Sequence, residues 1–249
     1  MKKAICVFSS ILFLWIFSSE IEEAFILFNQ RYALPNQAAS LKQAEEAVGI
    51  MEDNIEEIEK DDSLFFQYVI AKDYCLANCA KYNKQRKSDY AELLGRINEA
   101  NKKKNSCYYD YSLSILYGRL GETANILDAV KSNIPNNIKK YAEKVIEQDS
   151  SLDNHGAYLI LGRLHAMTPK IIYLTHWVSL KKSEEYLKKY IKFNPETVIG
   201  RLYLAETYRM MKNIEKHDSL IQILKESLPE SKRFYEDKSI IDSLNFIDF

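Results

Sequence analysis

Two prolines that stand thirty-four residues apart, Pro195 and Pro229, are the feature that most constrains the fold of this chain. Each proline ends a segment whose apolar residues recur at helical spacing, and a second such segment lies upstream of it. The upstream segments share a pattern: YxxLGxxH begins at Tyr158, and RxxLAxxY begins at Arg201. The sequence therefore predicts two consecutive helix pairs, each of which ends at a proline.

This period and pattern resemble the tetratricopeptide repeat, a helix-turn-helix unit with a large residue, Leu-Gly, Tyr, Ala-x-x-x-Phe and a final Pro. We expect the clearest repeats at residues 155–195 and 198–229. The small residues Gly162, Ser183 and Ala205 allow the paired helices to approach closely. Each pair is expected to complete its core by stacking on its neighbours.

Glycine and proline are scarce, with seven and five residues in a chain of 249. Long segments of helical periodicity with so few breaks indicate an all-α protein. We predict an α-solenoid of antiparallel helix pairs over residues 20–249, with a capping C-terminal helix over residues 232–249. Within it, a helix over residues 124–130 is expected to end at Ile134-Pro135, and the next helix to cover residues 139–148. The net charge of −1 gives no electrostatic reason to expect nucleic-acid binding.

Residues 1–19 have the features of an export signal. Lys2 and Lys3 precede an apolar run from Ala4 to Phe17, which is too short for a comfortable membrane span. The alternative is an uncleaved anchor helix that continues toward Phe28. Either interpretation places the rest of the chain in the periplasm or cell envelope, and an uncleaved segment would anchor it to the membrane.

Three cysteines follow the apolar run: Cys75, Cys79 and Cys107. Cys75 and Cys79 share one face of a predicted helix, a spacing that suits packing better than a disulfide. We interpret the cysteines as small core residues. A disulfide between Cys107 and one of the other two is the alternative. No histidine falls near them in the sequence, so no metal site is expected there.

The sequence contains no recognisable catalytic motif. A nucleophile elbow, a phosphate loop, a metalloprotease helix and a dinucleotide fingerprint are all missing from it. The acidic run from Glu52 to Asp62 surrounds Ile55 and Ile58 at amphipathic spacing and lacks the ligand loop of a calcium motif. It is better interpreted as a solvated helix face. We therefore predict a protein that is not an enzyme and holds no cofactor or metal.

The first clear helix pair contains an insertion. Leu161 and Pro195 are thirty-four residues apart, whereas Leu204 and Pro229 are twenty-five apart, so about nine extra residues separate the helices of the first pair. The apolar residues of this insertion are Ile171, Ile172, Tyr173, Leu174, Trp177 and Val178. They either fold back as an extra buried segment, or they line a ligand cleft or contact a partner.

In tetratricopeptide arrays the first helix of each pair generally faces the concave groove. We therefore expect the groove to be lined by Leu159, Arg163, Leu202, Glu206 and Arg209. Tyr173 and Trp177 of the insertion are expected to close the site. The guanidinium of Arg163 would bind an anionic group in a forked geometry, and the aromatic rings would cover an apolar tail. In the alternative, Arg163 pairs with a neighbouring acid and Trp177 is a core residue.

An exported, all-helical chain with degenerate repeats and such an insertion resembles the T component of TRAP transporters. The residues that carry the resemblance are Ala142, Val145, Tyr158, Leu161, Gly162, Pro169, Ser183, Leu187, Asn194, Pro195, Leu204, Ala205 and Tyr208. The resemblance implies a periplasmic, often lipid-anchored oligomer that associates with the substrate-binding P component and helps to deliver hydrophobic organic acids. The chain departs from that family in having no lipobox cysteine after the apolar run.

Two functions follow as expectations. The first is an accessory protein of a TRAP-type solute transporter, a homo-oligomer that binds a partner protein and a small hydrophobic organic acid. The second is a general tetratricopeptide scaffold for envelope protein assembly, which recognises peptides along its concave face. An enclosed apolar pocket near the insertion would favour the first function. A charge-patterned groove without a closed cleft would favour the second.

Overall fold

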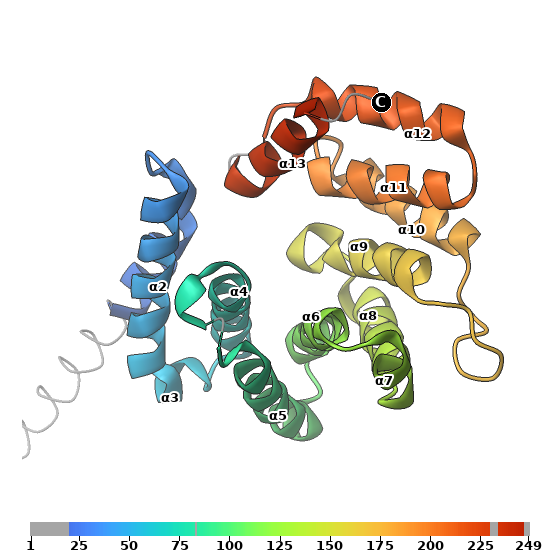
Figure 1. The fold of residues 1–249 in the computed structure, drawn as a ribbon. Helices are drawn as coiled ribbons and strands as arrows, with labels where there is room; N and C mark the ends of the chain where they lie inside the picture. Colours follow the sequence, from blue (N-terminus) through green and yellow to red (C-terminus); the bar gives the residue numbers. More distant parts are fainter. Residues whose placement is uncertain (1–19, 83, 230–233, 247–249) are drawn as a thin grey trace, which may run out of the picture. The chain divides into compact units, whose positions relative to one another are not determined.

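The computed structural model describes residues 20–82, 84–229 and 234–246. These residues form helices and connecting loops, and no β-strand occurs among them. The chain divides into two compact units, Met1–Arg86 and Lys87–Phe249 (Figure 1). The predicted export signal or anchor at residues 1–19 lies outside the described residues.

The first unit contains a helix over residues 20–30 followed by η1 (Arg31–Ala33), α2 (Gln37–Asp53), α3 (Ile55–Ile58), α4 (Asp62–Asn78) and η2 (Ala80–Tyr82). Helix α2 contacts α4, and its buried residues recur every three or four positions, as a helix packed on one side requires. Arg31 is buried nearby, with its guanidinium 3.7 Å from the ring centre of Phe28 and 4.3 Å from that of Tyr74 on α4. These cation–π contacts connect the segment after the first helix to α4.

The three cysteines are free thiols. Cys75 and Cys79 are buried at the end of α4, and Cys107 is half-buried in the second unit. The hydrogen bond with Cys79 and burial both raise the pKa of the Cys75 thiol. The interpretation of Cys75 and Cys79 as core residues is confirmed, and the alternative disulfide with Cys107 is not formed.

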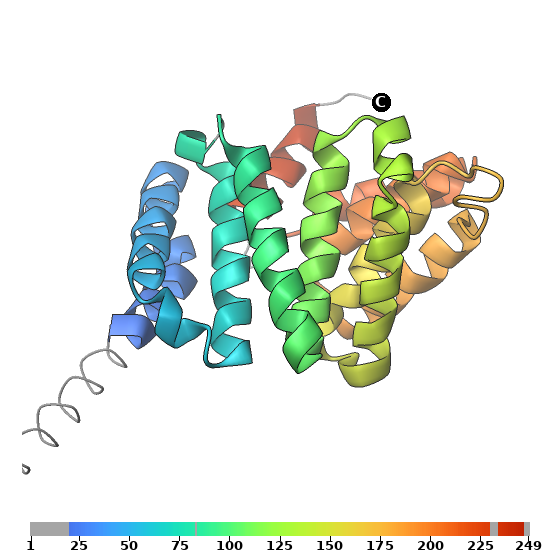
Figure 2. The ribbon, with the colours of Figure 1, turned by 90° about the horizontal axis from the view of Figure 1, so that it is seen from below.

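Helix α5 (Arg86–Lys104) begins at the last residue of the first unit. The second unit then contains α6 (Cys107–Thr123), α7 (Ile126–Lys131), α8 (Ile134–Asp149), α9 (Leu152–Met167), α10 (Leu180–Phe193), α11 (Val198–Met210), α12 (Ile214–Lys225) and α13 (Phe234–Phe246). From α7 onward each helix contacts the next one along the chain, and α6 also contacts α8 (Figures 1 and 2). The prediction of an all-α fold is confirmed, and packing between sequence neighbours is consistent with a helical-repeat array.

Helices α9 and α10 approach each other closely at Gly162 of α9. The Ser183 hydroxyl of α10 lies 2.8 Å from the Gly162 carbonyl oxygen, to which it can donate, and 2.9 Å from the Thr207 hydroxyl of α11. A Cβ atom at Gly162 would lie 2.5 Å from Cγ of Leu187, so a larger residue does not fit there. The expected close contact between Gly162 and the Ser183 helix is confirmed.

Helix α8 begins earlier than the sequence predicts. Ile134 and Pro135 form its first turn, and Asn133 before them has the left-handed φ of 57°. The expectation that Ile134-Pro135 ends a helix and that the next one begins at residue 139 is therefore wrong. Proline is favoured at the first position of a helix because its missing N–H would have no intrahelical acceptor there.

At the other end of the second unit, α13 contacts α11 and α12. Its residues Ile241 and Leu244 are buried in a cluster with Val198 and Leu224. The C-terminal helix that the sequence predicts is thus present as α13, and it adds apolar surface to the last helix pair.

Candidate functional site

Helix α8 has two faces of different character. Its buried face consists of Ile134, Ile138, Ala142 and Val145, at the three- and four-residue spacing of an amphipathic helix. The opposite face carries amide and charged side chains at the same spacing: Asn136, Lys139, Lys140, Glu143, Lys144 and Glu147. The same periodicity that anchors α8 therefore aligns these polar residues in a row.

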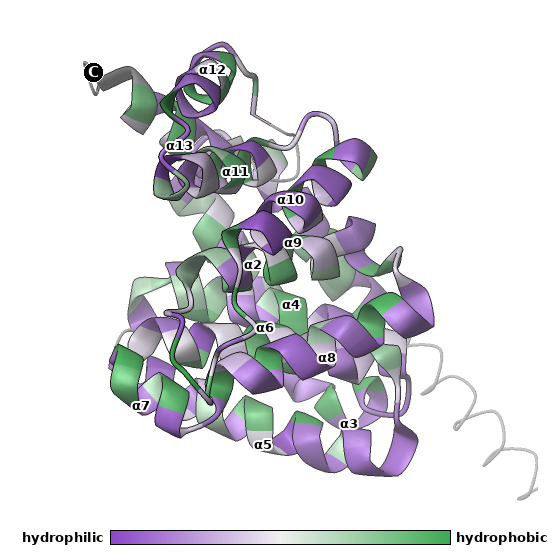
Figure 3. Ribbon diagram, turned by 90° about the vertical axis from the view of Figure 1, so that its right-hand side faces the viewer, coloured by the Kyte–Doolittle hydropathy of each residue, from purple (hydrophilic) through white to green (hydrophobic). Residues whose placement is uncertain are grey.

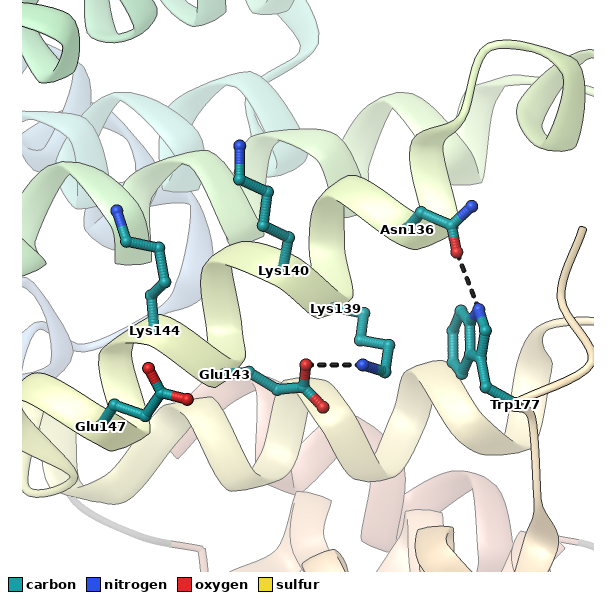
Figure 4. Close-up of a pocket in the computed structure, with 7 residues that line it drawn as sticks. All are labelled: Asn136, Lys139, Lys140, Glu143, Lys144, Glu147 and Trp177. Carbon is teal, nitrogen blue, oxygen red and sulfur yellow. Dashed lines mark hydrogen bonds and ion pairs between the residues drawn. The ribbon is translucent and has the colours of Figure 1, made fainter.

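This row and Trp177 line an open surface hollow with a volume of about 340 Å³, which we call the α8 groove (Figure 4). Trp177 comes from the loop between α9 and α10 and forms one end of the groove. Its indole Nε1 donates a hydrogen bond to Oδ1 of Asn136 at 2.7 Å. This bond fixes the orientation of the indole ring beside the first turns of α8.

Several charges of the α8 groove are neutralised within the protein. Lys139 Nζ lies 2.6 Å from a carboxylate oxygen of Glu143, and Lys144 Nζ lies 2.8 Å from the buried carboxylate of Asp110. Lys140 and Glu147 have no ion-pair partner in the part of the chain that the structure describes. The Lys140 ammonium lies 4.7 Å from the Tyr141 ring centre. One positive and one negative charge therefore face solvent from the same groove.

The separation of these two charges can be derived from the helix. Lys140 and Glu147 are seven residues apart, which corresponds to about 10 Å along an α-helix. Both positions are exposed. A ligand that pairs with both must carry opposite charges at a similar separation.

The predicted groove residues on α9 and α11 lie apart from the α8 row. Arg163 of α9 forms an ion pair with Glu206 of α11, and its guanidinium lies 4.2 Å from the Tyr203 ring centre. Leu159 and Leu202 are partly buried against neighbouring apolar clusters, and Arg209 is exposed. Arg163 thus has the acidic partner that the alternative interpretation expects.

Only part of the insertion folds back as the buried segment that the first interpretation expects. Its second half folds back: Val178 is buried, Trp177 is half-buried, and the buried Thr175 accepts a hydrogen bond from the Ile171 N–H at 2.9 Å. Its middle does not, because Ile172 and Tyr173 are 75% and 91% exposed. Of the two aromatic residues predicted to close a site, only Trp177 lines the α8 groove, and Tyr173 extends into solvent.

His165 packs against Trp177. It is buried, its ring centre lies 5.2 Å from that of Trp177 in an edge-to-face arrangement, and it stacks on Tyr186. The Ser179 N–H donates to His165 Nδ1 at 3.3 Å. Burial lowers the pKa of His165 to about 4, so the imidazole is neutral at physiological pH.

Sequence reasoning found one residue of the α8 groove, Trp177, and missed the row on the helix. The signal was present as KKxxEKxxE from Lys139 to Glu147. Such alternating charges are typical of an ordinary solvated helix face. Only the position of Trp177 next to this face distinguishes it from other charged helix surfaces.

No protein-family model matches this chain, and a search of curated proteins found no match either. Within the described ranges, no cluster of three or more His, Cys, Asp or Glu side chains is arranged to hold a metal ion. Across those same residues, none of the helices combines the length and the apolar character needed to cross a membrane. The geometry of the site itself must therefore carry any functional proposal.

Proposed function

We propose that this chain is a helical-repeat scaffold, not an enzyme, that recognises an extended segment of a partner protein along the α8 groove. The observation that carries this proposal is the exposed pair Lys140 and Glu147, which have no ion-pair partner in the described residues. A segment in the polyproline II conformation rises about 3.1 Å per residue and has three residues per turn, so charges three residues apart share a face and match the separation of this pair. The expected partner segment carries an acidic and a basic residue at that spacing.

Trp177 supplies the apolar contact of the proposed site. A half-buried indole whose N–H is already bonded to Asn136 presents a fixed aromatic surface to a ligand. Aromatic residues of this kind are enriched at binding surfaces because they bury a large area with few rotatable bonds. We expect the partner segment to place an apolar or proline residue against this ring.

The open form of the α8 groove favours a protein ligand over an enclosed small molecule. Its lining consists of charged and amide side chains except for Trp177. Ligand sites for small hydrophobic molecules are usually concave and mostly apolar. A charge-patterned, open groove beside the insertion is the feature expected of a scaffold for protein assembly.

A second candidate is the accessory protein of a TRAP-type transporter. The observation that favours it is that Trp177 and Lys140, which has no ion-pair partner in the described residues, line the same groove, because an aromatic surface with an available cation suits an organic acid. In this candidate, residues 1–19 direct the protein to the periplasm or cell envelope. There it forms a homo-oligomer and associates with the substrate-binding component of the transporter.

A peptide-display selection tests the first proposal. The wild type is expected to enrich peptides with an acidic and a basic residue about three positions apart. Lys140→Glu and Glu147→Lys should each weaken their binding roughly fivefold, whereas the double reversal should prefer peptides with the two charges exchanged. The matched control is the Glu185→Lys/Lys189→Glu variant on the exposed face of α10. Enrichment of the same peptides by the wild type and the double reversal would contradict the proposal.

A titration with small aromatic carboxylates such as benzoate distinguishes the second candidate from the peptide-binding scaffold. Calorimetric binding that is lost in Trp177→Ala, with the fold intact by circular dichroism, would favour the transporter accessory. Fractionation of the native cells tests the envelope location that this candidate needs. Finding the protein in the cytoplasm would remove it, while the peptide-binding proposal would stand on its own measurement.

A further inference from the structure

Exposed apolar side chains occur on two neighbouring segments of the second unit, α7 and the loop between α9 and α10. Figures 1 and 2 show the loop between α9 and α10 beside the short helix α7, and Figure 3 shows hydrophobic turns in α7. The residues concerned are Ile126 (62% exposed), Leu127 (64%), Ile172 (75%), Tyr173 (91%) and Leu174 (47%). We call these five residues the apolar tip. Clustered apolar exposure of this kind marks an interaction surface more often than single exposed residues do.

The loop holds its part of the apolar tip away from the core. Thr175, at the base of the loop, donates to the Pro169 carbonyl at 2.5 Å, and Asn136 of α8 donates to the Leu174 carbonyl at 3.5 Å. Tyr173 has the left-handed φ of 70°, which is unfavourable for a residue with a bulky side chain. The structure thus keeps a strained backbone conformation that presents Ile172 and Tyr173 to solvent.

The charges next to the apolar tip are unbalanced. Lys131 at the end of α7 and Lys170 in the loop are both exposed, and neither has an ion-pair partner among residues 20–82, 84–229 and 234–246. The one acid of α7, Asp128, accepts a hydrogen bond from the neutral side-chain amide of Asn125, the residue that caps this helix, and keeps its charge. The two lysines outnumber this acid, so α7 and the loop carry a net positive charge.

We propose that the apolar tip docks onto the anionic surface of a lipid bilayer. Aliphatic side chains and a tyrosine can enter the interfacial region, while lysines beside them remain at the level of the headgroups. Unpaired lysines favour a surface rich in anionic lipids over a neutral one. The apolar tip and its two lysines share no charged residue with the α8 groove. The tip is therefore a second surface of the proposed scaffold.

The geometry points to a bilayer rather than to a protein. The side chains of the apolar tip protrude, with Tyr173 almost fully exposed, so a protein partner would have to supply a deep apolar pocket flanked by acids. A bilayer needs no such matching shape and supplies both the apolar interior and the negative charge. Binding of this kind is peripheral and requires no membrane-spanning helix.

The test uses the full chain and vesicles with bromine-labelled acyl chains, which quench tryptophan fluorescence on contact. In a Trp15→Phe background, Tyr173→Trp places a reporter at the apolar tip. Ile214→Trp, at the exposed start of α12, is the matched control. Because both proteins share Trp177 and residues 1–19, a difference between them compares lipid contact at residue 173 with that at residue 214, whatever the N-terminal segment does.

With vesicles of phosphatidylglycerol and phosphatidylcholine, the fluorescence at position 173 should be quenched and that at position 214 should not. In the Lys131→Glu/Lys170→Glu variant, about ten times more lipid should be needed to reach the same quenching. Quenching should also weaken in vesicles of pure phosphatidylcholine and in high salt. Equal quenching at both positions, or none at 173, would overturn the proposal. Equal quenching by neutral and anionic vesicles would overturn its electrostatic part. No quenching at 173, together with a photo-crosslink from this position to a protein, would assign the apolar tip to a protein partner instead.

Discussion

Two regions of the second unit differ in how their polar side chains are satisfied. One is the interface of α9, α10 and α11, and the other is the outer surface that the α8 groove and the apolar tip form. At the interface, Ser183 and Thr207 are fully buried, and their hydroxyls lie within hydrogen-bonding distance of each other and of backbone carbonyls. On the outer surface, Lys140 and Glu147 have no ion-pair partner in the described residues, and Tyr173 is 91% exposed. The interface completes its interactions internally, whereas the outer surface leaves them available.

This contrast separates stability from binding. Substitutions at the interface remove buried contacts, so they should lower the free energy of unfolding and leave any recognition unchanged in the folded protein. Substitutions on the outer surface should change recognition and cost little stability. His165 and Trp177 lie where the two regions meet, and they allow the contrast to be tested from both sides.

The largest effect is expected from acid. The His165 imidazole has a pKa of about 4 in the folded protein against an ordinary 6.5, so only the unfolded chain binds its proton between these values. The stability that neutral His165 contributes is therefore fully present above pH 6.5 and is lost as the pH falls toward 4. The loss corresponds to at most about 3 kcal/mol in the free energy of unfolding.

Urea unfolding of the wild type and of two histidine variants at pH 7 and pH 4.5 measures this loss. All other titrating groups are common to these proteins, so their contributions cancel in the comparison. His165→Gln should remove much of the difference between the two pH values. His176→Gln, which changes an exposed histidine, should retain it. If His165→Gln and the wild type lose the same stability in acid, the neutral buried imidazole is not the cause.

The next effect concerns the close contact between α9 and α10 at Gly162. Gly162→Leu would force a side chain into the position of Leu187, and we expect a loss of about 1–3 kcal/mol in the free energy of unfolding. Gly118→Leu in α6 is the matched control, since a Cβ atom there meets nothing within 4 Å. Thermal and urea unfolding compare the two. Equal stability of both variants would show that α9 and α10 are not in tight contact.

The accuracy of the sequence-based predictions follows the same division. The small residues Gly162 and Ser183 report the helix contact directly, because a close approach leaves no room for other residue types. The start of α8 was misplaced because Ile134-Pro135 reads equally well as the end of one helix or the beginning of another. Which one holds depends on whether Ile134 is buried, and that depends on residues distant in sequence.

The candidate site was less predictable for a physical reason. Lys140 and Glu147 differ from any other exposed charges only in what lies next to them. Trp177 is thirty-seven residues beyond Lys140 in the sequence, and its position follows from the way the insertion folds back. Helical periodicity carries no information on such a contact between a loop and a distant helix.

A smaller effect is expected at the point where the two regions meet. Trp177→Phe keeps an aromatic ring over His165 but removes the hydrogen bond from Nε1 to Asn136, which should cost about 1 kcal/mol. A double-mutant cycle with Asn136→Ala isolates this bond, because the second substitution should cost less once the first is made. Additive losses would show that the indole is held by packing alone, and the α8 groove would then have a less fixed end.

The smallest effect is expected at Arg163, and it decides between the two interpretations of that residue. Its ion pair with Glu206 is partly exposed, with about 32% and 27% of the two side chains accessible, so solvent screens much of the attraction. Arg163→Met keeps an aliphatic side chain but removes the ion pair and the guanidinium that lies over the Tyr203 ring, and at this partly exposed site it should cost less than about 1 kcal/mol. Glu206→Gln should cost a similar amount, and the double variant should cost less than the sum if the pair is the interaction removed.

Peptide binding by the α8 groove should be unchanged in all three variants, since neither Arg163 nor Glu206 lines it. If Arg163→Met instead abolishes binding of peptide or aromatic carboxylate while the fold is retained, recognition takes place on α9 and α11, and the proposed site on α8 is the wrong one.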